Sequence, residues 1–311
     1  MDTYKIVFLD SITIGSASLD PIRKLGEFVE YKTTTPDQTA GRIADADIII
    51  SNKVRIFKPE MDAAKKLKLI CVAATGTNNI DTEYALSKGI PVKNVCAYST
   101  ESVVQTTFMH ILSLVGHTNF YDNYVKSGQY GQSGIFTCPT TQFTRLAGKT
   151  MGIIGLGTIG ERVAQVASAF GMNVIYYSTQ GKAHNDKYRM LPLQELLAQS
   201  DVVTIHCPLN GRTNALIGYK ELQSMKRNAI LVNVARGGIV VEQDLADAID
   251  RGIIAGAAAD VFTTEPIGEN HPYLKMSKKE NIILSPHIAW NSYEDVDALI
   301  KGIAENIRTF S

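Results

Sequence analysis

Three polar side chains follow predicted strands in the second half of the chain, and each could take part in chemistry. Arg236 comes after AILVNVA, Glu265 after AGAAADVF and His287 after IILSP. Because ligands of open α/β sheets bind at the carboxyl ends of the strands, we expect these groups to converge at one edge of one sheet. Taken singly, each has a plainer role: a surface arginine, an acid that ends a turn before Pro266, and a packed loop histidine.

Together the three side chains suit the interconversion of a 2-keto acid and a 2-hydroxy acid. A guanidinium binds a carboxylate through two parallel hydrogen bonds. Histidine exchanges a proton near neutral pH, and a nearby carboxylate orients its ring. With a nicotinamide beside them, these groups would complete the set that hydride transfer to a carbonyl carbon needs.

A glycine-rich turn upstream indicates where a dinucleotide would bind. Gly155-Leu156-Gly157-Thr158-Ile159-Gly160 follows the strand MGII and opens the helix ERVAQVASAF, which is the context that a GxGxxG fingerprint requires. Gly155 permits the tight turn, Gly157 removes a Cβ from the path of the pyrophosphate, and Gly160 lets helix and strand approach. The alternative is a strand–helix turn without a ligand.

The residue after the next strand bears on the choice of cofactor. An NAD enzyme usually has an acid there, which accepts hydrogen bonds from the ribose 2′-hydroxyl. Here NVIYY is followed by Ser178, with Lys182 close by and no arginine to hold a 2′-phosphate. The sequence favours NAD and leaves NADP open.

Alternating strands and helices must position these groups. Continuous apolar runs, typical of parallel strands covered on both faces, predict strands at Lys5–Leu9, Asp47–Ser51, Leu67–Ala74 and Ile90–Val95. A helix over 101–115 and a loop from Ser127 to Thr144 follow. A second series predicts strands at Met151–Ile154, Asn173–Tyr177, Val202–His206, Ala229–Val234, Ile254–Ala259 and Ile282–Leu284. This alternation is typical of doubly wound sheets.

The bulk composition excludes several classes of protein. Lys plus Arg and Asp plus Glu balance at 31 each over 311 residues, which argues against nucleic acid as a partner. No apolar run approaches the length of a membrane span, and no secretory signal is visible. The six histidines lack metal-ligand spacing, and the four cysteines form no CxxC pair. We therefore expect a cytoplasmic protein without a metal site or a membrane partner.

Five segments resemble the D-isomer-specific 2-hydroxyacid dehydrogenase family, over nearly the full length of the chain. They are GLGTIG (155–160), HCPLNGRTNALI (206–217), LVNVARGGIVVEQDL (231–245), AAADVFTTEP (257–266) and LSPHIAW (284–290). The resemblance implies that Arg236 binds the substrate carboxylate, that His287 is the general acid and base, and that Glu265 tunes this histidine.

The resemblance also implies further binding residues. On the substrate side these are Thr75 and Gly76 in the loop 74–81, Tyr98 in CAYSTES, and Trp290. On the cofactor side they are Gly155, Gly157, Thr158, Ile159, Gly160, Ser178, His206, Cys207, Pro208, Thr213, Val234, Ala235 and Asp260, the last close to the nicotinamide carboxamide. Strand-end packing is the alternative role for His206, Cys207 and Pro208.

The family architecture implies a Rossmann cofactor domain (100–287) inserted into a flavodoxin-like substrate domain (1–99 and 288–311). The final helix, from about Ser292, would then pack on the N-terminal domain through Val296, Leu299, Ile300, Ile303 and Ile307. The helix 101–115 would contribute to a homodimer interface.

Trp290 and CAYSTES most resemble the glycerate dehydrogenase (hydroxypyruvate reductase) branch, which implies D-glycerate and hydroxypyruvate as the substrate pair. Glyoxylate or a D-lactate-type substrate is the near alternative. A different class remains open as well, a non-catalytic NAD-sensing binding protein of the same fold.

Overall fold

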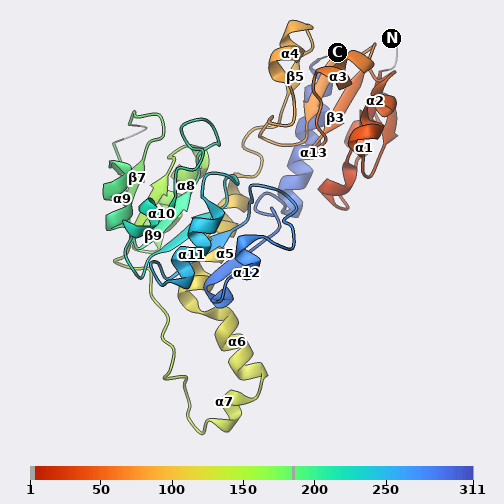
Figure 1. The fold of residues 1–311 in the computed structure, drawn as a ribbon. Helices are drawn as coiled ribbons and strands as arrows, with labels where there is room; N and C mark the ends of the chain where they lie inside the picture. The colour runs from red at the N-terminus through yellow and green to blue at the C-terminus, as the bar shows by residue number, and fades with distance from the viewer. Residues whose placement is uncertain (1–3, 184–185, 311) are drawn as a thin grey trace. The chain divides into compact units, whose positions relative to one another are not determined.

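The chain forms two compact α/β units in a computed structural model that describes residues 4–183 and 186–310 (Figure 1). The first unit combines Met1–Ser99 with Trp290–Ser311, and the second is Thr100–Ala289. The sequence predicts a crossing at about residue 100 and a return near residue 288. In the structure the chain re-enters the first unit at Trp290.

The first unit is built on a five-stranded parallel sheet in the order β2-β1-β3-β4-β5. This is the flavodoxin-like order. The strands are β1 (Lys5–Phe8), β2 (Glu27–Glu30), β3 (Ile48–Ser51), β4 (Leu69–Val72) and β5 (Val92–Lys93). Its helices are η1 (Ser11–Ile14, a 3-10 helix), α1 (Asp20–Arg23), α2 (Pro36–Ile43), α3 (Lys58–Ala63), α4 (Thr82–Ser87) and α13 (Tyr293–Arg308).

Strand β2 is the one strand of this sheet that the sequence analysis missed. Its sequence EFVE mixes charged and apolar residues, and none of its side chains is fully buried. Its only neighbour is β1, so it is an edge strand that needs no continuous apolar run. The central strand β3 has the opposite pattern, since Ile48, Ile49 and Ile50 are all buried.

Helix α13 completes the core of the first unit although it is the last element of the chain. Ser292 caps it by accepting a hydrogen bond from the backbone N–H of Asp295 (3.1 Å). The predicted apolar face is confirmed, because all five of its members are buried: Val296, Leu299, Ile300, Ile303 and Ile307. They pack in one cluster with Ile6, Phe8 and Ile50 of the sheet.

The second unit is built on a seven-stranded parallel sheet in the order β12-β11-β10-β9-β6-β7-β8. The three strands from β6 to β8 run in reverse order beside β9, which is the Rossmann arrangement with one added strand. The strands are β6 (Thr150–Ile154), β7 (Asn173–Tyr177), β8 (Arg189–Met190), β9 (Val202–Ile205), β10 (Ile230–Asn233), β11 (Gly256–Ala259) and β12 (Ile282–Leu284). The two sheets confirm the predicted fold class.

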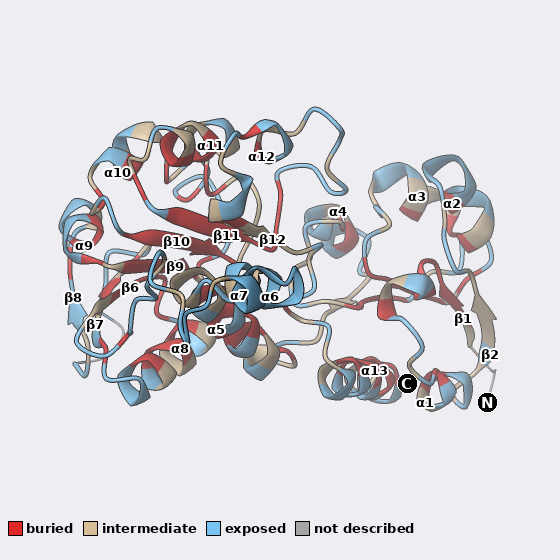
Figure 2. Ribbon diagram, turned by 90° about the horizontal axis from the view of Figure 1, so that it is seen from below, coloured by how far each residue is buried: buried red, intermediate tan, exposed pale blue. Residues whose placement is uncertain are grey.

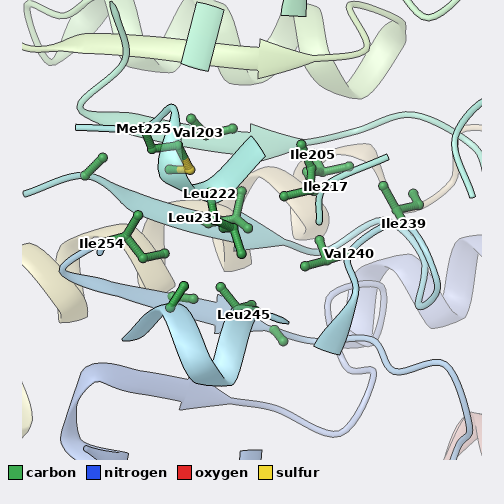
Figure 3. Packing of buried hydrophobic residues seen from close by; sticks show 14 of the residues in the cluster. Val203, Ile205, Ile217, Leu222, Met225, Leu231, Ile239, Val240, Leu245 and Ile254 are labelled. Atoms are coloured by element: carbon green, nitrogen blue, oxygen red, sulfur yellow. The ribbon is translucent and has the colours of Figure 1, made fainter. Parts of the chain in front are cut away.

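Helices cover both faces of this sheet, and its central strands β6, β9, β10 and β11 are buried (Figure 2). On one face, α10 and α11 contribute Leu222 and Leu245 to a cluster with Val203 and Leu231 of the strands (Figure 3). The helices of the unit are α5 (Thr100–Gly116), α6 (Thr118–Lys126), α7 (Gln129–Gln132), α8 (Thr158–Ala169), α9 (Leu193–Gln199), α10 (Tyr219–Gln223), α11 (Glu242–Asp250), α12 (Pro272–Lys275) and η2 (Lys279–Asn281, a 3-10 helix).

The segment 117–144, which we call the arm, extends away from the rest of the second unit (Figure 1). The sequence predicts a loop over 127–144, but the short helix α7 lies within it. Neither α6 nor α7 has a buried residue, and Figure 2 shows both helices as exposed. No helix in 4–183 or 186–310 has the length and apolar character that crossing a membrane requires.

Candidate active site

Arg236, Glu265 and His287 lie at the carboxyl ends of three strands that are neighbours in one sheet. Arg236 follows β10, Glu265 follows β11 and His287 follows β12. The strand order places β11 between β10 and β12. Parallel pairing therefore brings the three loops to the same edge of the second unit.

His287 and Glu265 form a direct pair. The Nδ1 atom of His287 lies 2.7 Å from Oε2 of Glu265, and both side chains remain partly accessible. An ionised carboxylate can only accept, so Nδ1–H donates and Nε2 is the ring nitrogen left for a substrate. The other oxygen of Glu265 accepts from the backbone N–H of Phe262 (2.9 Å) and so fixes the carboxylate.

The backbone of His287 adopts a conformation that residues with a Cβ rarely take. Its φ is +56°, in the left-handed region. The loop is held on both sides of this residue: His287 N donates to Ser285 O (3.0 Å), and the Asp260 carboxylate accepts from Ile288 N (2.9 Å) and Ala289 N (2.8 Å). Such strain persists where the surroundings impose it, and it concentrates at functional sites.

Asn233, a residue that the sequence analysis missed, shapes the turn that presents Arg236. Its side chain is buried, donates to Arg236 O (2.9 Å) and accepts from Ala235 N (3.1 Å). The guanidinium itself donates from Nη1 to Ala235 O (2.7 Å), its one hydrogen bond within the described residues. Since a guanidinium carries five N–H groups, others remain to bind a carboxylate.

The turn after Arg236 packs directly against the loop that carries Glu265. A Cβ added at Gly237 would lie 1.9 Å from the carbonyl oxygen of Phe262. Only a glycine lets the two backbones approach this closely. The positions of Arg236 and Glu265 are therefore coupled through Gly237.

The three glycines of the fingerprint have three different surroundings. Gly155 has φ +94°, and a Cβ there would lie 2.9 Å from Cys207 N. A Cβ on Gly160 would lie 2.2 Å from Gly155 O, which shows the close approach of helix α8 to the turn. At Gly157, in contrast, a Cβ would meet no protein atom within 4 Å.

The space beside Gly157 fits a dinucleotide phosphate. Gly157 is the N-cap of the twelve-residue helix α8, in an extended conformation that a larger residue could adopt. No neighbouring protein atom requires glycine at this position. A phosphate bound at the helix N-terminus would require it, because a Cβ would occupy the same space. The backbone N–H groups of Thr158 and Ile159, in the first turn, belong to this end of the helix.

Ser178 and His206, two of the predicted cofactor residues, follow the strands β7 and β9, which lie on either side of β6. Ser178, after β7, is buried, and its Oγ has no hydrogen-bond partner among the residues that the structure describes. His206, after β9, contacts Thr204 Oγ1 through Nε2 (2.9 Å). Burial lowers the pKa of His206 to about 3, so its ring is neutral at physiological pH.

Thr213 holds the loop after β9 in place. Its buried hydroxyl donates to Pro208 O (2.6 Å) and accepts from Asn210 N (2.8 Å). Cys207 is buried against Gly155, and burial raises the pKa of its thiol to about 11. The structure therefore gives both residues a packing role; Val234 follows β10 directly and is buried as well.

The predicted substrate residues Thr75, Gly76, Tyr98 and Trp290 belong to the first unit. Thr75 and Gly76 follow β4 at the carboxyl edge of its sheet, and Thr75 Oγ1 donates to Val95 O (3.1 Å). The rings of Tyr98 and Trp290 meet edge to face at 6.5 Å. Within the described residues, no cluster of three or more His, Cys, Asp or Glu could hold a metal ion.

Comparison with known proteins gives consistent matches over the whole chain. The family described as D-isomer specific 2-hydroxyacid dehydrogenase, NAD binding domain, matches residues 108–289. A hydroxypyruvate reductase of Blautia hydrogenotrophica is 34% identical, over 98% of this chain and 96% of its own. A glycerate dehydrogenase of Methylorubrum extorquens is 35% identical, over 99% and 96%. The crystal structure of D-lactate dehydrogenase from Aquifex aeolicus, complexed with NAD and lactic acid, superimposes with a TM-score of 0.85 at 26% identity, over 98% of this chain and 95% of that one.

Proposed function

Because this chain belongs to the D-isomer-specific 2-hydroxyacid dehydrogenase family, we propose that it interconverts D-glycerate and hydroxypyruvate with NAD or NADP. The observation that carries the proposal is the His287–Glu265 pair at one sheet edge with Arg236, downstream of a glycine turn that leaves room for a phosphate. The relatives named hydroxypyruvate reductase and glycerate dehydrogenase support this substrate pair.

Each group of the site has a distinct role in the proposed reaction. Arg236 binds the substrate carboxylate through the N–H groups that the protein leaves unused. His287 gives a proton from Nε2 to the carbonyl oxygen during reduction and takes it back during oxidation. Glu265 holds the ring in the tautomer with Nδ1–H and fixes its orientation. The cofactor supplies or accepts the hydride when bound.

Substrate choice rests on the first unit in this proposal. We assign substrate contacts to Thr75, Gly76, Tyr98 and Trp290. Support comes from the position of the loop 74–79 after β4, at the edge where sheets of this class bind ligands. Glyoxylate and a D-lactate-type acid remain the competing substrates.

A spectrophotometric assay tests the reaction. The purified protein is mixed with hydroxypyruvate, glyoxylate or pyruvate and with NADH or NADPH, and absorbance of the reduced cofactor is followed. We expect the highest kcat/KM with hydroxypyruvate. His287→Ala should lower kcat by about 10²- to 10⁴-fold and leave cofactor binding intact. Normal turnover in this variant would remove His287 from the mechanism. Cofactor binding without turnover in the parent protein would favour the NAD-sensing alternative.

Ser178 offers a test of cofactor preference. An aspartate there would accept hydrogen bonds from the ribose 2′-hydroxyl and repel a 2′-phosphate. We expect Ser178→Asp to raise the ratio of kcat/KM for NADH to that for NADPH. The same kinetics as the parent with both cofactors would show that position 178 does not face the ribose.

We also propose a homodimer formed through the arm (117–144). Support comes from its exposed apolar side chains and from the hollow of about 750 Å³ that α6 and α7 form with the amino ends of β10 to β12. A second copy would cover this surface, since monomeric proteins rarely expose such patches. The cytoplasm is the proposed location, because the four cysteines are free, which fits a reducing compartment.

A further inference from the structure

A chain of polar side chains, buried at His110 and Asp260 and partly buried at Ser285, runs from helix α5 to the loop of His287. His110 Nε2 on α5 lies 3.2 Å from Ser285 Oγ, and Ser285 Oγ donates to Asp260 Oδ1 at 2.5 Å. Asp260 in turn accepts from the backbone N–H groups of Ile288 and Ala289. All of these residues belong to the second unit.

We propose that His110 is a positioning residue for the reaction, which acts through Ser285 and Asp260 on the loop that carries His287. The inference rests on the proposed function of His287. It concerns a residue that the sequence shows only as one position of a long apolar helix.

Packing alone does not account for a histidine at position 110. Its buried neighbours on α5 include the apolar residues Val104, Phe108 and Ile111 as well as Thr106 and Thr107, and no hydrogen bond joins His110 to either threonine within the described residues. His110 is 5% exposed, and its Nδ1 is buried without a hydrogen-bond partner. An unsatisfied buried acceptor is costly, and a leucine would fill the same space without that cost. A buried polar group of this kind requires a compensating role.

The hydrogen bonds fix which nitrogen of His110 carries the proton. The hydroxyl of Ser285 has one hydrogen, and the Asp260 carboxylate takes it. Ser285 Oγ can therefore only accept from His110, so Nε2 carries the hydrogen and Nδ1 is bare. Burial lowers the pKa of the His110 imidazole, and this effect outweighs the negative charge of Asp260, which raises it. The ring therefore donates in its neutral form.

The hydrogen bond from His110 to Ser285 affects how firmly Asp260 is held. This carboxylate is fully buried and holds the backbone on the far side of His287. Donation from His110 to Ser285 polarises the hydroxyl and strengthens its bond to Asp260, because linked hydrogen bonds reinforce one another. Without that donor the hydrogen bond from Ser285 to the carboxylate is weaker, and Asp260 holds the loop, with His287 at φ +56°, less firmly.

Three substitutions of His110 test the proposal. His110→Leu fills the space without a donor, His110→Gln places an amide N–H near the position of Nε2, and His110→Asn places one near Nδ1. We expect kcat to fall about tenfold in the Leu and Asn variants, with KM for the keto acid within twofold of the parent. In the Gln variant, kcat should lie within about threefold of the parent value.

Hydrogen exchange of the backbone gives a readout that needs no turnover. We expect the segment 286–291 to exchange about tenfold faster in His110→Leu than in the parent, and His110→Gln to restore slow exchange. Melting temperature should not be lower in His110→Leu than in His110→Gln. Parent-like exchange in the Leu variant, or equal losses in Leu and Gln, would overturn the inference. An inactive parent protein would contradict the proposed function alone.

Discussion

At the scale of single residues, the site depends on how one imidazole is held. Glu265 fixes Nδ1 of His287, and Glu265 is itself fixed by Phe262 N. Behind them, Gly237 brings the turn of Arg236 against the same loop. The proposed acid–base group and the proposed carboxylate anchor therefore share one support, and a change at that support should affect both.

The Glu265–His287 pair predicts a specific kinetic change. Glu265→Gln keeps the shape of the side chain but can present an N–H to Nδ1, which then stabilises the wrong tautomer. We expect kcat to fall by about 10- to 100-fold. Steady-state kinetics check this, with Glu269→Gln, four residues along the chain, as a control that should match the parent. An unchanged kcat in Glu265→Gln would separate the carboxylate from the reaction.

Arg236, Glu265 and His287 could be singled out from the sequence as candidates because each is a polar residue within a few positions of the end of an apolar strand, where parallel sheets bind their ligands. Asn233 could not, since its amide lies at the end of a buried strand and binds only backbone. His110 escaped prediction for a different reason. A histidine in a mostly apolar helix cannot be assigned a partner 175 positions away until the fold brings Ser285 beside it.

At the scale of elements, the turn between β6 and α8 contains one glycine that the fold requires and another that we propose binds the cofactor. Gly160 is required by the protein, since a Cβ there would overlap Gly155 O. A Cβ added at Gly157 would meet no protein atom within 4 Å. A sequence pattern alone treats the two as equivalent, and only the folded structure separates them.

This difference predicts opposite effects for two alanine substitutions. Gly160→Ala should destabilise the fold by about 1–3 kcal/mol, because helix α8 must move away from the turn. Gly157→Ala should change the melting temperature little but weaken NAD(H) binding by tenfold or more, as expected for a Cβ in a phosphate site. Thermal unfolding and a fluorescence titration with NADH check the pair. Tight NADH binding by Gly157→Ala would place the pyrophosphate elsewhere.

The sequence predicts strands best where they carry a continuous apolar run. Strands β7 and β12 match their predicted bounds, and β3 and β10 differ only at their ends. The edge strands β2 (EFVE) and β8 (RM) are missed because they have no such run, whereas the edge strands β5 and β12 lie in apolar segments and are predicted. Edge pairing depends on the neighbouring strand, and therefore on tertiary structure rather than local sequence.

At the scale of the whole molecule, the arm is the part that a single copy leaves uncovered. Phe136 is 91% exposed and Phe143 is 66% exposed. These exposed apolar side chains are the basis of the proposed dimer contact.

Sedimentation velocity tests the proposed dimer. We expect the parent protein to sediment with twice the mass of one chain, and the double variant Phe136→Glu, Phe143→Glu to sediment as a single chain. Tyr293→Glu is a matched control, because Tyr293 is 90% exposed but lies on α13, outside the arm. A dimer that survives the double variant would place the interface elsewhere.

The position of α13 at the end of the chain has a consequence for synthesis in the cell. Its side chains close the core around Ile6 and Phe8, yet the ribosome must first translate all of Thr100–Ala289. At ordinary elongation speed this delay is roughly 10–40 s. Throughout it, the nascent N-terminal sheet has an open apolar face, where a chaperone could bind. The N-terminal sheet is thus synthesised first but completes its core only after the second unit has been synthesised.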